Sequence, residues 1–125
     1  MKNILVTGGS GKAGRATIKL LLEKNYNVFN VDFVNNLELD VPFTKVDLAD
    51  FGDAMEVVSE IDDRINGIDA VIHQAAIPAS GLEANHKTFR ANTLSTYNIF
   101  QASKVMKINH IVWASSETVL GLPFE

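Results

Sequence analysis

The chain has 125 residues, of which 46% are hydrophobic and 21% are charged, as is typical of one globular domain. Its net charge of −4 gives no electrostatic reason to expect nucleic acid or an anionic membrane as a partner, and no apolar run approaches the ~20 residues of a membrane span. The absence of cysteine excludes disulfides, thiolate zinc sites and cysteine nucleophiles. No metal site is expected. The expected location is the cytoplasm.

Strand-like apolar runs alternate with helical periodicity along the whole chain. Strands are expected at residues Asn3–Thr7, 28–32, 43–46, 69–73 and 108–115, and helices at Lys12–Glu23, 54–65 and 87–106. This order predicts an α/β fold in which residues 1–125 form one Rossmann-type domain. Its doubly wound parallel sheet has the order 3-2-1-4-5 and is truncated after the fifth strand. A ligand is then expected above the ends of the first and fourth strands.

A glycine-rich turn connects the first strand to the first helix. Gly8, Gly11 and Gly14 follow an apolar strand and precede a helical run, which is the construction that binds the pyrophosphate of a dinucleotide. Lys12 and Ala13 lie in the first helical turn, where free N–H groups and the helix dipole favour an anion. The remainder of that helix offers apolar residues to the sheet, namely Ala13, Ala16, Leu20 and Leu21.

Asp32 ends the second apolar run, 18 residues after Gly14, close to the ~20 expected for a carboxylate that binds the adenosine ribose. Such a carboxylate repels a 2′-phosphate and favours NAD over NADP, whereas a cation such as Lys12 or Arg15 nearby would act against this preference by offsetting the repulsion. The alternative is a solvated carboxylate at a strand end. A nucleotide-hydrolase phosphate loop is excluded because Ala13 replaces the metal-binding Ser or Thr.

Four segments in order resemble the extended short-chain dehydrogenase/reductase family, in particular its NAD-dependent epimerase/dehydratase branch, which acts on nucleotide sugars. Residues 7–14 match its Thr-Gly-Gly-x-Gly-x-x-Gly turn, and residues 46–48 match its aspartate-apolar pair after the third strand. Residues 69–76 match its Asp-x-Val-x-His-x-Ala-Ala strand, and residues 112–121 resemble its Ser-Ser-x-x-Val-Tyr-Gly segment. The resemblance implies a Rossmann fold, an NAD cofactor and a nucleotide-sugar substrate.

The resemblance assigns the adenine end of the cofactor to the second segment. Asp47 would accept a hydrogen bond from the adenine amino group, and Leu48 would pack on the ring. The alternative for Asp47 is a helix N-cap before residues 49–50, and the two roles are compatible.

The resemblance also assigns residues of the fourth strand and the long helix. Ala75 and Ala76 would be small because the cofactor passes over their backbone, and Asn92 would steady the fourth strand from the long helix. A plain polar helix position is the alternative for Asn92. His73 is interpreted as a packed, hydrogen-bonded strand residue rather than a catalyst.

Candidate catalytic residues follow the fifth strand. By resemblance, Ser116 would hydrogen-bond the reacting hydroxyl or carbonyl of the substrate, while Ser115 would be the structural member of the pair on the cofactor side. Glu117 stands where dehydratases of the family place a general acid, but Thr118 departs from their Asp-Glu pair. Leu120 replaces the usual tyrosine, which puts a substrate contact in question.

The tyrosine and lysine that complete this catalytic set in the family are absent from the 125 residues. Neither Tyr26 nor Tyr97 has a lysine four positions later; position 101, for example, is Gln101. The expectation is therefore the N-terminal portion of a longer epimerase- or dehydratase-like enzyme, which binds NAD but does not turn over substrate. The alternatives are a non-catalytic dinucleotide-binding or redox-sensing module, and an α/β domain that binds nothing.

Association between copies is also expected. The helix predicted from Lys87 to Met106 has more apolar surface than one sheet-facing side needs, and the fifth strand would be an edge with apolar residues on both faces. A homodimer through either surface is the expected arrangement.

Overall fold

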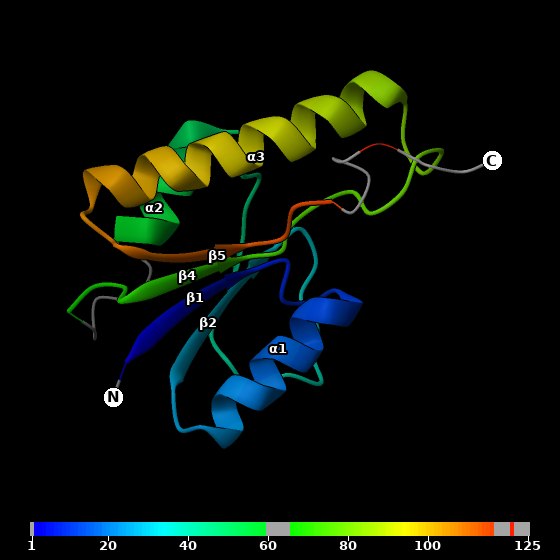
Figure 1. Ribbon diagram of the computed structural model, residues 1–125. Helices are drawn as coiled ribbons and strands as arrows, with labels where there is room; N and C mark the ends of the chain where they lie inside the picture. Colours follow the sequence, from blue (N-terminus) through cyan, green and yellow to red (C-terminus); the bar gives the residue numbers. More distant parts are fainter. Residues whose placement is uncertain (1, 60–65, 117–120, 122–125) are drawn as a thin grey trace.

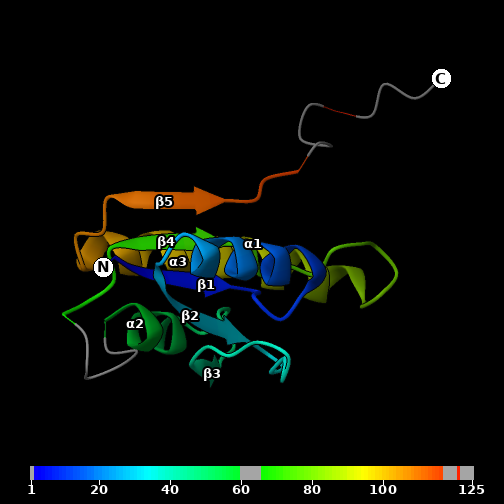
Figure 2. The same ribbon diagram turned by 90° about the horizontal axis from the view of Figure 1, so that it is seen from below.

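The computed structural model describes residues 2–59, 66–116 and 121, and it shows a five-stranded parallel sheet with the order β3-β2-β1-β4-β5 (Figure 1). This confirms the predicted topology. The strands are β1 Asn3–Thr7, β2 Asn27–Asp32, β3 Phe43–Lys45, β4 Ala70–His73 and β5 His110–Trp113. Figure 2 shows β3 at one edge of the sheet and β5 at the other.

The central strands are apolar because helices cover both faces of the sheet. Leu5 and Val6 of β1 point to opposite faces, and both are fully buried. Thr7 pairs with Val31 of β2 and with His73 of β4, so the carboxyl ends of these strands lie side by side. The segments that follow these three strands therefore come together at the carboxyl-terminal end of the sheet.

In the part of the chain that the structure describes, α1 (Lys12–Glu23) covers one face of the sheet, and α2 (Phe51–Ser59) and α3 (Asn85–Val105) cover the other (Figure 1). On the α1 side, Ile18 packs with Ile4, Val6 and Val28. The larger cluster on the other side includes Ile99 of α3.

The rotation of α1 about its axis differs from the expectation. Gly14 and Ile18 are its buried residues and Leu21 packs beside them, whereas Leu20 is 55% exposed. Ala13 and Ala16 are exposed as well. The cause is Gly14, which lies against the turn before the helix and sets which side of α1 meets the sheet.

Several element boundaries also differ from the sequence prediction. α2 begins at Phe51 because Asp50 Oδ1 accepts hydrogen bonds from the N–H groups of Gly52 (2.7 Å) and Asp53 (3.2 Å), which is an N-cap. The predicted end of this helix, residues 60–65, lies outside the described residues. β5 is shorter than expected at both ends, and α3 begins two residues earlier.

No helix in the described part of the chain has both the length and the apolar character needed to cross a membrane. The described residues also contain no group of three or more His, Asp or Glu side chains placed to hold a metal ion.

Candidate functional site

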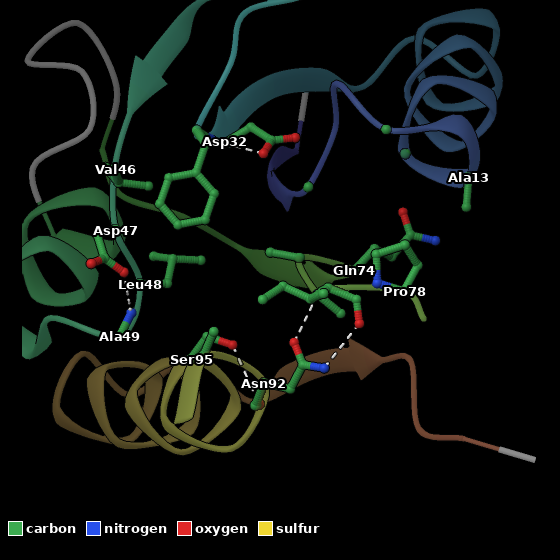
Figure 3. A pocket seen from close by; sticks show the side chains of 18 of the residues that line it. Ala13, Asp32, Val46, Asp47, Leu48, Ala49, Gln74, Pro78, Asn92 and Ser95 are labelled. Carbon is green, nitrogen blue, oxygen red and sulfur yellow. Dashed lines mark hydrogen bonds between the residues drawn. The ribbon is translucent and has the colours of Figure 1, made fainter. Parts of the chain in front are cut away.

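A cavity of about 460 Å³ lies at the carboxyl ends of β1, β2 and β4, between the glycine-rich turn and α3 (Figure 3). Most of the cofactor-binding residues expected from the sequence line it. They are Gly8, Gly11, Lys12, Ala13, Gly14, Asp32, Asp47, Leu48, Ala75, Ala76 and Asn92. The cavity therefore stands at the predicted switch point of the sheet.

The glycine turn needs its glycines for two separate reasons. Gly8 has φ +70°, which side chains disfavour, and a Cβ there would lie 2.7 Å from the backbone N and Cα of Ala75. At Gly14 a Cβ would collide with the carbonyl oxygen of Gly8. These contacts bring the turn close to the chain after β4 and the start of α1 close to the turn.

The N-terminus of α1 is open toward an anion. Gly11 is the N-cap residue, no side chain among the described residues caps the helix, and its first turn contains no acidic residue. The first N–H groups of a helix have no partner within the helix, and the positive end of the helix dipole lies behind them. Lys12 adds a positive charge at the same place on the cavity wall.

Asp32 is half-buried at the end of β2, and its carboxylate is held in place from two sides. Its Oδ2 accepts a hydrogen bond from Ser10 N (3.1 Å), and its Oδ1 accepts one from Phe33 N (2.7 Å). Each carboxylate oxygen retains a lone pair for a further donor. Asp32 thus belongs to the cavity wall, and its carboxylate holds the glycine turn through Ser10 N. A carboxylate that is merely solvated at a strand end would make neither contribution.

The chain after β3 is anchored by α3. Leu48 is 5% exposed, and its carbonyl oxygen accepts a hydrogen bond from Asn98 Nδ2 at 2.9 Å. Asp47 Oδ1 accepts one from Ala49 N at 3.0 Å and so forms a local turn. The alternative role of Asp47 as a helix N-cap is wrong, because Asp50 caps α2.

Asn92 fixes the chain after β4 to the long helix. Its Nδ2 donates to Ile77 O (3.0 Å), and its Oδ1 accepts from Ile77 N (2.8 Å), as the dashed lines in Figure 3 show. The bond pair reaches the loop that follows the strand rather than the strand itself. Ala75 and Ala76 lie just before this anchored residue, on the cavity wall.

His73 is 2% exposed and lies between Thr7 of β1 and Thr96 of α3. Burial lowers the pKa of His73 to about 4, so its ring is neutral at neutral pH. The structure thus agrees with the interpretation of His73 as a packed, hydrogen-bonded strand residue.

The structure does not bring Ser115 or Ser116 to the cavity. Ser115 and Ser116 are exposed and are not part of its wall. β5 ends at Trp113, and residues 114–116 lead away from the sheet (Figure 2). Glu117 and its neighbours Thr118 and Leu120 lie outside the described residues.

Sequence reasoning missed several residues of the cavity wall. They are Phe33, Val46, Ala49, Gln74, Ile77, Pro78, Ala91 and Ser95. Most are chain neighbours of residues that were predicted, so extending each motif by one or two positions would have found them. Ala91 and Ser95 lie on either side of Asn92 in the sequence. They are four positions apart, which places both on one side of α3.

Comparison with known proteins identifies the family. Residues 4–125 match the NAD dependent epimerase/dehydratase family, and the chain belongs to it. It is similar to the UDP-glucose 4-epimerase of Caenorhabditis elegans, with 30% identity over 98% of this chain and 40% of the relative. It is also similar to the UDP-glucose 4-epimerase of Schizosaccharomyces pombe, with 32% identity over 96% of this chain and 36% of the relative.

A solved structure agrees with this assignment. The UDP-glucose 4-epimerase of Bifidobacterium longum, solved in complex with NAD+ and UDP, superimposes with a TM-score of 0.80 at 29% identity. The match covers 99% of this chain and 40% of that one. The chain thus spans about 40% or less of the length of these three proteins.

Proposed function

We propose that the cavity binds NAD, with the pyrophosphate at the N-terminus of α1 and the adenosine ribose on Asp32. One observation carries the proposal: an uncapped helix N-terminus and an acidic strand end lie on the walls of a single cavity. The turn places N–H donors toward two linked phosphates, and the carboxylate offers acceptors to ribose hydroxyls. Asp47 and Leu48 are the proposed contacts of the adenine.

We propose a preference for NAD over NADP. A 2′-phosphate would meet the negative charge of Asp32, and the nearby cation Arg15 is within 4.0 Å of Glu38. The pairing of Arg15 with Glu38 reduces its ability to compensate that repulsion. Both members of the pair are solvent-exposed, so this second contribution is small.

Calorimetric titration of the 125-residue chain with NAD and with NADP tests both proposals. NAD is expected to bind more tightly, and Asp32→Ala should weaken NAD more than NADP because the ribose acceptors are lost. Asp40→Ala is a control, since it also removes an aspartate carboxylate, but one that is exposed and does not line the cavity. Absence of heat with either cofactor under conditions where the chain is folded would refute cofactor binding.

We infer that the chain is the cofactor-binding portion of an epimerase- or dehydratase-like oxidoreductase that acts on a nucleotide sugar. The nicotinamide, when bound, supplies transient hydride acceptance at a sugar carbon. Ser116 is proposed to hydrogen-bond the reacting oxygen, with Glu117 as a candidate proton donor and Ser115 on the cofactor side. The chain has no Tyr-x-x-x-Lys sequence, so it should show no interconversion of UDP-glucose and UDP-galactose by itself.

A non-catalytic dinucleotide-binding or redox-sensing module is the second candidate. Two observations favour it: the chain has no Tyr-x-x-x-Lys sequence, and Ser116 does not lie on the cavity wall. A sensor must respond differently to the two oxidation states, so unequal conformational responses to NAD and NADH without turnover would support it. Measurable epimerase turnover by the chain would exclude it.

We also propose a homodimer through α3 or through β5, which is an edge strand of the sheet among the described residues. In support, Phe89 and Tyr97 of α3 are 71% and 60% exposed, and Val112 of β5 is 65% exposed. Exposed apolar surface and an unpaired strand edge both favour association. Sedimentation velocity over a range of concentrations checks this: Tyr97→Glu should weaken a dimer formed through α3, and a concentration-independent monomer would refute the proposal.

A further inference from the structure

A line of hydrogen bonds connects β1, β4 and α3 directly beside the cavity. Thr7 and His73 are the last residues of their strands and pair in register. Thr7 Oγ1 lies 2.6 Å from His73 Nδ1, and His73 Nε2 lies 3.1 Å from Thr96 Oγ1. Thr7 is fully buried and His73 is 2% exposed, so water does not compete for the bond between them, whereas Thr96 is half-buried.

The direction of the Thr7–His73 bond follows from counting donors and acceptors. The backbone N–H of Ala75 donates to Thr7 Oγ1 at 3.1 Å, and the N–H of Gln74 is shared between Thr7 Oγ1 and Thr7 O, each at 3.1 Å. A hydroxyl oxygen has two lone pairs and one proton. Because the two amides occupy both lone pairs, the hydroxyl proton is left for His73 Nδ1. This nitrogen is therefore unprotonated, and the ring proton on Nε2 is donated to Thr96.

A protonated ring would not fit this arrangement. An imidazolium has two N–H donors, so Thr7 Oγ1 would face three donors with two lone pairs. The low pKa that burial gives His73 is consistent with the neutral ring required by the geometry. The side chains that hydrogen-bond the ring, from β1 and from α3, are uncharged threonines.

The two amides held by Thr7 belong to the cavity. Gln74 and Ala75 line it, and the backbone of Ala75 lies against Gly8, whose added Cβ would approach Ala75 N and Cα to 2.7 Å. A shift of the chain after β4 would therefore push directly on the glycine turn.

We propose that His73 is a positioning residue of this site. By accepting the hydroxyl proton of Thr7, it turns both lone pairs of Thr7 Oγ1 toward the N–H groups of Gln74 and Ala75. It thereby fixes the backbone on which the glycine turn rests. The predicted effect on NAD affinity rests on the proposed function above, whereas the tautomer and the hydrogen bonds of the unliganded chain do not.

A long-range ¹H–¹⁵N NMR spectrum of the unliganded chain at neutral pH tests the tautomer directly. His73 is expected to show an unprotonated Nδ1 and a protonated Nε2. A protonated Nδ1, in either the other neutral tautomer or the imidazolium, would overturn the proposal. This test needs neither a variant nor a cofactor.

Two substitutions of His73 separate positioning from packing. In His73→Asn the amide oxygen takes the place of Nδ1 and still accepts from Thr7, whereas His73→Leu offers no acceptor. The Ala75 amide should exchange its hydrogen about tenfold faster in the Leu variant, and NAD affinity should fall about tenfold, as expected for loss of a buried hydrogen bond. The Asn variant should retain most of both properties.

Equal effects of Asn and Leu on both readouts would show that only ring packing matters, and would overturn the proposal. If the Leu variant does not fold, Thr7→Val and Thr7→Ser provide the same contrast, since only Ser keeps the hydroxyl. If the parent chain binds no NAD, the proposed function fails, but the exchange rate of Ala75 still decides the positioning role.

Discussion

Lowering the pH should destabilise this protein through the burial of His73. In the folded state burial lowers the pKa of His73 from 6.5 to about 4, so the unfolded chain binds the proton more strongly. Stability from the neutral ring is therefore complete above the unfolded pKa and is lost as the pH falls toward the folded pKa. The whole shift corresponds to about 3 kcal/mol, of which about 2 kcal/mol is lost between about pH 7.5 and about pH 5.

Urea unfolding of the parent chain and of His73→Asn at these two pH values isolates this contribution. The substitution removes the titrating group, and every other titratable side chain stays the same in both proteins. The free energy of unfolding of the parent should fall by about 2 kcal/mol more than that of the variant. Fluorescence of Trp113, the one tryptophan in the sequence, and far-UV circular dichroism report the transition.

Parallel pH dependence in the two proteins would refute this reasoning. It would mean that the ring of His73 is either accessible to protons in the folded state or stabilised as a cation there. A greater fall in the variant than in the parent would have the same consequence, because the sign of the linkage would then be reversed.

Two further predictions concern Gly14 of the cavity wall and the ion pair between Arg15 and Glu38. Gly14→Ala should destabilise the chain by about 1–3 kcal/mol and weaken NAD binding, because the new Cβ collides with the carbonyl oxygen of Gly8. Gly11→Ala, whose Cβ would lie 3.3 Å from that oxygen, is the matched control, and equal losses in urea unfolding would contradict the argument. Glu38→Gln should raise NADP affinity about two- to fivefold by releasing Arg15, with little change for NAD in calorimetry. Equal changes for both cofactors would count against it.

The strand order and most of the cavity wall could be predicted from local sequence patterns. Apolar runs alternate with helical periodicity, and crossover handedness then leaves few sheet orders. Gly8, Gly11 and Gly14 identify the turn because backbone that approaches this closely tolerates no side chain. Asp32 is recognisable because it ends a strand at a suitable distance along the chain.

The phase of α1 could not be read from its apolar pattern. Leu20 and Ala16 suggest one side of the helix, but the contact between Gly14 and Gly8 turns Ile18 to the sheet instead. The apolar residues indicate that the helix packs against the sheet, whereas a close backbone contact decides which side of the helix faces the sheet.

The sequence by itself determined the glycine turn and the acidic strand end, because each depends on residues close together in the chain. It determined the sheet order through the alternation of strands and helices and the handedness of the crossovers between them. Only the tertiary structure decided that Asn98 holds Leu48 and that Thr7 receives two amides and gives its proton to His73. These bonds join residues about 50 or more positions apart. The direction of the bond between Thr7 and His73 depends on how many donors contact the buried Thr7 Oγ1. Those donors reach it only after the strands have packed together with α3.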